Sequence, residues 1–230
     1  MRILLTNVVR NVVRTSLQGV YDKGTVMQAL LNNAGLYPAW RDGLAYNDLS
    51  TAMGFGRSCP SAPELLRLDW ASPLALLNSA RFASRVYRSY TLPATYLGPT
   101  GVMIKIQPDW LGSAYTKNIY LALRVKAAGD SDLAAEFNGK LNVHEADKDV
   151  DNDVMRIGDP RISFVRAVDP GSSVLLFNYR LHILTGDLVQ GNTMVIKICR
   201  FFSAGPNECV EGTSLPSINR LHGEIDAHWD

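Results

Sequence analysis

The feature that most restricts the fold is a series of short stretches in which apolar and polar residues alternate. From about residue 87 the pattern has a period of two, as in the last stretch, where Met194, Ile196 and Ile198 face one way and Lys197 the other. This alternation is typical of strands that are buried on one face. The stretches are joined by turn-forming residues, and they predict an antiparallel β-sandwich over residues 86–205. They are 101–107, 118–125, 140–145, 161–168, 173–177, 179–184 and 193–200.

Before residue 86 the apolar residues recur at helical spacing. Residues 25–34 predict a helix with Thr25 as its N-cap, and Ser61-Ala62-Pro63-Glu64 is a capping box that starts another helix, running to about residue 68. Residues 3–17 favour an amphipathic helix with Arg10 and Arg14 on its polar side, although the valines leave a strand open. The apolar positions of that segment are Ile3, Leu4, Val8, Val9, Val12, Val13 and Leu17.

Residues 28–38 have the spacing of a metalloprotease zinc helix, H-E-x-x-H-x-x-G-x-x-H, and a methionine turn follows such a helix in the metzincins. In that helix two histidines four residues apart hold one ion, and the glutamate takes a proton from zinc-bound water. In this chain the glutamate position holds an alanine, which has no titratable group. The histidine positions hold a proline, which offers no ligand atom, and two amides, which suit zinc poorly. Hydrolysis by this route is therefore predicted to be lost, and a plain helix ending at a glycine is the alternative. The histidine positions hold Gln28, Asn32 and Pro38, the glutamate position Ala29, the glycine position Gly35, and the turn Met53.

Three longer stretches carry a resemblance to a known family. They are 25–74, which begins TVMQALLNNAGLYPAWRDG, 90–125, which begins YTLPATYLGPTGVMIKIQ, and 137–147, FNGKLNVHEAD. They resemble the gametolysin family, the zinc metalloproteases of volvocine green algae that digest cell-wall and matrix glycoproteins. The resemblance implies that Met53 forms an apolar floor under the site. Glutamine at the position of Gln28 is within the range of the family, whereas Ala29, Asn32 and Pro38 depart from it.

The predicted architecture is α+β, with three parts. Residues 1–85 are expected to be the remnant of a metzincin-like metalloprotease domain with a degenerate zinc helix. Residues 86–205 form the antiparallel β-sandwich, and 206–230 a loose tail. Residues 1–24 do not look like the family, so the chain is interpreted as a shortened member.

Cysteine and carboxylate patterns suggest further local features. Cys199 and Cys209 bracket a short loop, and a disulfide between them is expected if the protein is secreted, which leaves Cys59 as a buried free thiol. Residues 147–153 alternate carboxylates as a calcium loop does, but they lack its glycine and closing glutamate, so a solvated acidic loop is predicted. The histidines of 222–228 are attributed to chance composition, and His144 is assigned no role.

Charge and hydropathy narrow the possible partners. The formal net charge of +1 gives no electrostatic case for nucleic-acid or membrane binding. Polar residues such as Asn7 and Arg10 interrupt the apolar start of the chain, so no signal peptide is predicted. No stretch approaches the about 20 apolar residues of a membrane span.

The leading functional hypothesis is a pseudoenzyme of the extracellular matrix or cell wall. It would bind a glycoprotein without a metal cofactor, although zinc serves the family, and no catalytic residue is assigned. One alternative is an active zinc metalloendopeptidase that degrades cell-wall glycoproteins, with ligands from His144 or the tail. Another is a fragment whose apolar faces lack partners. The oligomeric state and the glycoprotein bound are left open.

Overall fold

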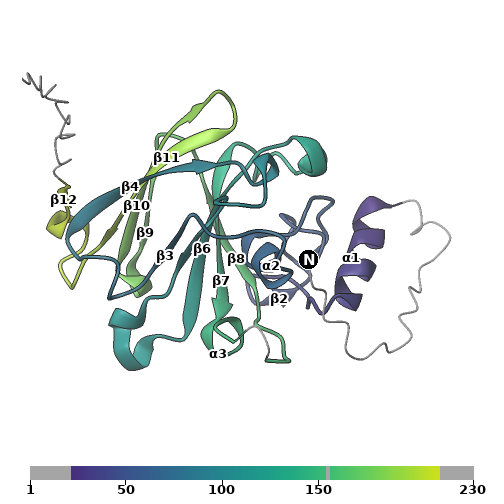
Figure 1. Cartoon of the computed structure of the whole chain (residues 1–230), viewed down its shortest axis with the longest axis horizontal. Helices are drawn as coiled ribbons and strands as arrows, with labels where there is room; N and C mark the ends of the chain where they lie inside the picture. Colours follow the sequence, from purple (N-terminus) through teal and green to yellow (C-terminus); the bar gives the residue numbers. More distant parts are fainter. Residues whose placement is uncertain (1–21, 154–155, 213–230) are drawn as a thin grey trace, which may run out of the picture.

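Two facing β-sheets form the body of the protein (Figure 1). The computed structural model describes residues 22–153 and 156–212. Within them one sheet has seven strands, in the order β2-β1-β8-β7-β6-β5-β3, and the other has five, in the order β12-β4-β11-β10-β9. Apolar side chains of both sheets meet in one buried cluster, with Leu121 and Val143 on one side and Ile183 and Ile196 on the other. The predicted α+β class is confirmed at this level.

The strands agree closely with the period-two stretches. Each of the seven stretches contains one strand, β5 to β11, and these strands pair antiparallel wherever they are neighbours. The pairs β1–β8, β3–β5 and β12–β4 are parallel, so neither sheet is purely antiparallel. The larger sheet contains β1 (Trp40–Arg41), β2 (Leu44–Ala45), β3 (Ala75–Leu77), β5 (Ile104–Ile106), β6 (Lys117–Arg124), β7 (Lys140–Asp147) and β8 (Ser163–Val168). The smaller contains β4 (Val86–Pro93), β9 (Ser173–Leu176), β10 (Leu181–Val189), β11 (Thr193–Arg200) and β12 (Val210–Glu211).

Strand β6 is covered on both faces. Ile119 and Leu121 point into the sandwich, whereas Tyr120 and Ala122 belong to a second cluster with α2 (Ala62–Arg67). A strand buried on both sides reads as a continuous apolar run, which is what residues 119–123 are. The larger sheet is thus the middle layer, between the smaller sheet and α2.

Helix α1 (Lys23–Asn33) lies at one end of the molecule (Figure 1). The predicted N-cap, Thr25, is wrong by three residues. The side chain of Asp22 caps the helix, because its carboxylate accepts the Thr25 N–H at 2.9 Å. No helix among the described residues is long and apolar enough to span a membrane. The helix predicted over residues 3–17 lies outside the described residues.

The larger sheet takes strands from both sides of residue 85. Strands β1, β2 and β3 come from residues 40–77 and pair with β8 and β5. Leu77 and Phe82 also lie in the core between the sheets. Residues 22–85 therefore share a sheet and a core with the rest of the chain, and their apolar side chains have partners.

The chain beyond β11 is tied to the smaller sheet. Cys199 and Cys209 are joined by a disulfide, a short helix (Pro206–Glu208) lies inside the loop, and β12 pairs with β4. Residues 206–212 are thus attached to a sheet edge, whereas the sequence placed them in a loose tail. Residues 213–230, including the histidines of 222–228, lie outside the described residues.

Residues 147–153 are the solvated loop that the sequence predicted only in part: Asp149, Asn152 and Asp153 are exposed, but the stretch contains a short helix and a buried carboxylate. Lys148–Asp151 forms α3, and Asp151 is only 2% exposed. Its carboxylate lies 2.7 Å from Lys105 Nζ and accepts hydrogen bonds from Tyr120 Oη and Asn118 Nδ2. A carboxylate can be buried when a cation and hydrogen-bond donors surround it. The prediction failed for Asp151 because these partners come from β5 and β6, far from it in the sequence.

Acid is expected to loosen the disulfide loop. The Glu208 carboxylate accepts the backbone N–H groups of Phe202, Ser203 and Ala204, and these bonds lower the pKa of Glu208 from 4.5 to about 2. Because the folded-state pKa lies below the ordinary value, this stabilisation is complete above about pH 4.5 and is lost as the pH falls through about 2. An NMR titration of the Glu208 carboxyl should show the low midpoint. Glu208→Gln should loosen the loop already at neutral pH, and a carboxyl midpoint near 4.5 would contradict the prediction.

Candidate functional site

Helix α1 carries the first of the predicted site residues. Gln28 and Asn32 are one turn apart and share a face, and Asn32 is exposed. The helix is followed by Gly35, whose φ of +91° suits glycine and whose N–H donates to the Asn32 carbonyl at 3.1 Å. This turn leads the chain away from the helix axis toward Pro38.

Met53 is fully buried against α1. It forms a cluster with Leu31 of the helix and with Leu36 and Ala39 of the segment that follows. The Ala39 N–H also donates to the Met53 carbonyl at 3.0 Å. The helix, the glycine turn and the methionine of the predicted pattern are therefore packed together.

Gln28 joins the helix to the methionine turn directly. Its Nε2 atom donates to the carbonyl of Gly54, the residue after Met53, at 2.9 Å. Gln28 and Gly54 also line a cavity of about 240 Å³ with Arg57. At the first histidine position of the pattern there is thus an amide that binds the protein's own backbone.

The residues at the metal positions do not fit zinc. Ala29 and Pro38 have no side-chain donor atom, and Asn32 and Gln28 offer only neutral amide oxygens, which are weak zinc ligands. Among residues 22–153 and 156–212, no group of three His, Cys, Asp or Glu side chains is placed to hold a metal ion. The positions that the spacing pattern assigns to zinc ligands therefore carry an unsuitable donor set.

His144, on β7, lies in a buried polar cluster with the segment that leads into the methionine turn. Its Nε2 atom is 3.1 Å from both Asp48 Oδ2 and Ser50 Oγ. A catalytic Ser-His-Asp arrangement needs the serine and the aspartate on different ring nitrogens. Burial acts to raise the pKa of Asp48, but the bonds and charge of His144 and the bonds from Ser50 outweigh it, so the pKa is lowered. The cluster is a structural one that anchors residues 48–50 to β7.

The same turn is held from its other side by Glu64 of α2. Thr51 Oγ1 donates to Glu64 Oε2 at 2.5 Å, and the Met53 N–H donates back to Thr51 Oγ1 at 3.2 Å. Glu64 also accepts the Ser61 N–H at 2.6 Å, as the predicted capping box requires, and burial raises the pKa of Glu64. Protein groups alone thus fix the turn that presents Met53.

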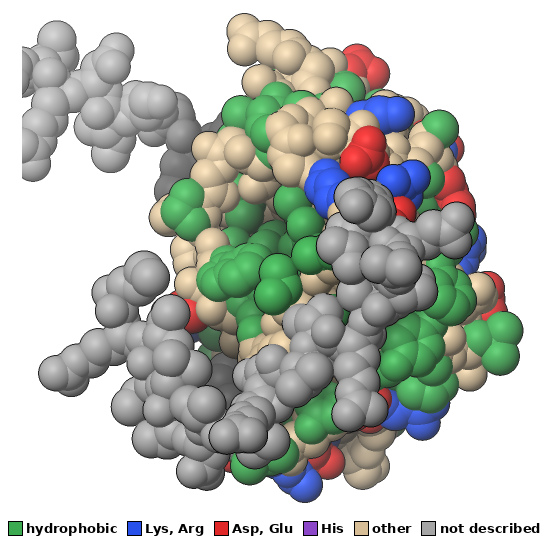
Figure 2. Space-filling view, turned by 90° about the vertical axis from the view of Figure 1, so that its right-hand side faces the viewer, with side chains coloured by type: hydrophobic (Ala, Val, Ile, Leu, Met, Phe, Trp, Pro, Cys, Tyr) green, Lys and Arg blue, Asp and Glu red, His purple; other side chains and the backbone are tan. Residues whose placement is uncertain are grey.

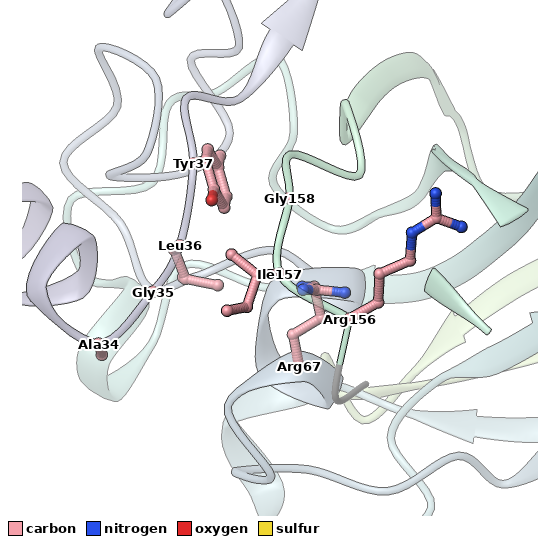
Figure 3. A pocket seen from close by; sticks show the side chains of 8 residues that line it. All are labelled: Ala34, Gly35, Leu36, Tyr37, Arg67, Arg156, Ile157 and Gly158. Atoms are coloured by element: carbon pink, nitrogen blue, oxygen red, sulfur yellow. The ribbon is translucent and has the colours of Figure 1, made fainter. Parts of the chain in front are cut away.

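A cavity of about 240 Å³ opens beside the chain that leaves α1 (Figure 3). Residues 34–37 line one side and residues 156–158 the other. Figure 3 shows the guanidinium of Arg67 beside Ile157, whereas the side chain of Arg156 points away from it. Arg67 donates to the Val150 carbonyl at 3.3 Å. The lining residues include no carboxylate or histidine that could serve as a general base.

A larger cleft, of about 470 Å³, lies at the mouth of the sandwich, where β7 ends and β1, β6 and β8 begin. No motif in the sequence marks its residues as a site. A signal was present, because the inward-facing positions of β6 and β7 change from apolar to charged at Lys117, Glu145 and Asp147. The lining residues are Trp40, Asp42, Gly43, Lys117, Glu145, Asp147, Arg161, Ser163, Phe164 and Val165.

This cleft presents hydrogen-bond acceptors and donors side by side. Glu145 is ion-paired with Lys117 and accepts a hydrogen bond from Tyr179 Oη. Burial raises the pKa of Asp147, and the charges of Lys117 and Arg161 oppose this. An adjoining cavity shares Glu145 and is edged by exposed apolar residues, Leu175 and Phe177 among them.

The aromatic wall of the cleft includes Trp40. The Arg161 guanidinium lies 4.4 Å from the centre of the Trp40 ring. Trp40 Nε1 is buried and has no hydrogen-bond partner within the described part of the chain. A buried N–H without an acceptor costs about 1–3 kcal/mol, and because this atom is shielded from solvent, the wall presents the face of the Trp40 ring to the cleft rather than a donor.

Comparison with known proteins identifies the family. The family model of gametolysin peptidase M11 matches residues 4–178. No curated protein and no solved structure matches. The expectation that residues 1–24 stand outside the family is wrong from residue 4 onward, because the motifs that carry the resemblance begin only at residue 25. Since the match covers more than half of the 230 residues, the chain belongs to the gametolysin family of metallopeptidases.

Proposed function

We propose that this chain is a non-catalytic member of its family that binds an extracellular glycoprotein and does not cleave it. The observation that carries the proposal is the donor set on and after α1. A general base contributes about 10²–10⁴-fold to such a reaction, and Ala29, at its position, has none. The first ligand position, Gln28, is tied to the Gly54 carbonyl. Hydrogen bonds of Thr51 and Glu64 hold the turn around Met53, so the turn can keep its conformation without a bound metal ion or a catalytic base.

The cleft at the sandwich mouth is the part of the surface best suited to a glycan. Sugar hydroxyl groups both donate and accept hydrogen bonds, and the cleft offers acceptors on Glu145 and Asp147 beside donors on Lys117 and Arg161. The Trp40 ring, with the Arg161 guanidinium 4.4 Å from its centre, adds an aromatic wall. A pocket with a few convergent polar groups and aromatic walls is the usual form of a small-ligand site.

An extracellular location agrees with the chemistry of the chain. The Cys199–Cys209 disulfide is typical of oxidising compartments. A net charge of +1 favours neither nucleic acid nor a membrane surface as partner. We therefore place the glycoprotein partner in the cell wall or extracellular matrix.

The alternative is an active zinc endopeptidase that takes its ligands from elsewhere. It requires histidines to converge near Gln28. His144 is buried and bonded to Asp48 and Ser50, and the histidines of 222–228 lie outside the described residues. No contact of the described residues favours this alternative over a binding protein.

Zinc content of the purified protein tests the proposal. The native chain is expected to be free of stoichiometric zinc, whereas the triple variant Ala29→Glu, Asn32→His, Pro38→His should take it up. The packing of α1 against the turn around Met53 supports this expectation, because it would hold the new ligands in fixed positions. The control variant Asn33→His, Ala34→Glu adds similar groups outside the pattern and should stay metal-free. Stoichiometric zinc in the native chain, with chelator-sensitive cleavage of a glycoprotein, would restore the enzyme alternative.

The binding part of the proposal is measured on immobilised glycans released from cell-wall glycoproteins. Arg161→Ser, in the cleft, should weaken binding about tenfold, the effect of one charge-assisted hydrogen bond. Arg166→Ser removes an exposed arginine of β8, the strand that begins just after Arg161. Arg166 does not line the cleft, so this change should leave binding unchanged. Equal effects of the two changes, or no binding by the native chain, would contradict the assignment of the cleft.

A further inference from the structure

An apolar groove runs along one side of α1. It has a volume of about 580 Å³, and almost all of its lining surface is apolar. Lys23 stands at the end of the groove where the helix begins. One wall is formed by Val26, Met27, Leu30 and Leu31 of α1, and the other by Cys59, Pro60, Leu65 and Trp70.

Large apolar side chains on both walls of this groove are exposed to solvent. Leu30 is 57% exposed and Trp70 is 54% exposed, one on each wall. Figure 2 looks at the end of the molecule that carries α1, and apolar side chains gather on this face. Contiguous exposed apolar surface on a soluble protein usually marks a place where another element packs.

The chain itself supplies a matching segment next to the groove. Residues 3–17 place their apolar side chains at helical spacing and their arginines on the other side, and they contain no acidic residue. They precede Asp22, the N-cap of α1, and the first groove residue is Lys23. The family match includes residues from 4 onward, so this segment is part of the same family unit as the groove.

The length of residues 3–17 and the reach of the chain that connects them to α1 both agree with packing along this helix. The chain from Leu17 to Lys23 spans at most about 20 Å, which is enough to reverse direction beside the helix. The groove extends along α1 from Lys23 to Leu31, a rise of about 12 Å. A helix of residues 3–17 would be about 22 Å long and would cover that length.

The geometry points to residues 3–17 as the occupant of the α1 groove, packed with their apolar face on Leu30 and Trp70. This assignment is independent of the zinc positions and of the cleft at the sandwich mouth, because none of their residues lines the groove. The N-terminal segment would then have a role in folding. It would cover the apolar side chains of α1 that line the groove and do not pack against Met53.

Amide hydrogen exchange of residues 3–17 in the full chain tests the proposal. The native chain should protect these amides, and Leu30→Glu should raise their exchange about tenfold, because a charge in the groove opposes docking. Leu30 is largely exposed, so the change is tolerated by the rest of the fold. Asn32→Glu adds the same charge to an exposed position of α1 outside the groove and should keep the protection.

Cys59 provides a second readout, because it lines the groove and has a free thiol, whereas Cys199 and Cys209 are joined in a disulfide. Burial raises the pKa of this thiol, so rates are compared between variants at one pH. Val9→Asp with Val13→Asp should speed labelling of Cys59 about tenfold, whereas Asn7→Asp with Asn11→Asp, on the polar side, should not.

Three results would overturn the proposal. The first is free-chain exchange of residues 3–17 in the native protein. The second is equal protection in the native chain and in Leu30→Glu. The third is protection that grows with protein concentration, which would mean that a second copy of the chain occupies the groove.

Discussion

Replacing Asp130 with asparagine is expected to destabilise the fold by about 3–5 kcal/mol. Asp130 and Arg124 are both buried, at 2% and 1% exposure. The carboxylate accepts Arg124 Nε at 2.8 Å and Nη2 at 2.7 Å in a two-pronged pair. Without its charge the guanidinium remains in the interior uncompensated, and removing one partner of a buried pair has this large effect.

The matched control is an ion pair on the surface. Asp169 lies 2.9 Å from Lys140 and is exposed, so Asp169→Asn should cost less than about 1 kcal/mol. Urea unfolding of the two variants beside the native chain gives both free energies. Equal losses in the two variants would show that water reaches Arg124 and that the pair is not buried in solution.

The Arg124–Asp130 pair also connects the core to one wall of the groove beside α1. Arg124 Nη2 donates to the Cys59 carbonyl at 3.0 Å, and the Cys59 N–H donates to Asp130 Oδ1 at 2.9 Å. Loss of the pair should therefore loosen residues 59–60 first. Faster labelling of Cys59 in Asp130→Asn, below the unfolding transition, would report that local step.

Local patterns in the sequence predicted the parts of the fold that depend on neighbouring residues. The alternation in 193–200 identifies β11 because one face of that strand is buried and the other is not. The capping box at Ser61 predicts the start of α2 because both groups of the box lie within one turn. The spacing from Gln28 to Gly35 predicts the helix and its end for the same reason.

Features that depend on distant partners could not be predicted in this way. Asp151 looked solvated because its cation, Lys105, lies on another strand. Strands β1 and β3 have two and three residues, too few to show any period. Trp40 and Glu145 come from different parts of the chain and meet only because β1, β8 and β7 are neighbours in the sheet. The cleft could have been suspected from charges at inward positions of β6 and β7, but its aromatic wall could not.

Gly54→Ala is expected to cost about 3 kcal/mol or more, through overpacking at a backbone contact. A Cβ at this position would lie 1.8 Å from the Asp48 carbonyl oxygen. That atom is backbone, and Asp48 is itself held by His144 and Ser50, so it cannot yield without disturbing buried hydrogen bonds. The change would also displace the carbonyl that accepts Gln28 Nε2.

Gly191→Ala is the control for this change, because its φ of +71° strains any other residue but nothing lies within 4 Å of the added Cβ. That strain should cost about 1 kcal/mol, so thermal unfolding should separate the two variants clearly. A small effect of Gly54→Ala would mean that the turn around Met53 is adaptable. A large effect would mean that the fold itself needs a rigid turn at this place. The packing of Met53, Gly54 and Asp48 would then be a sufficient physical reason for the shape of this turn.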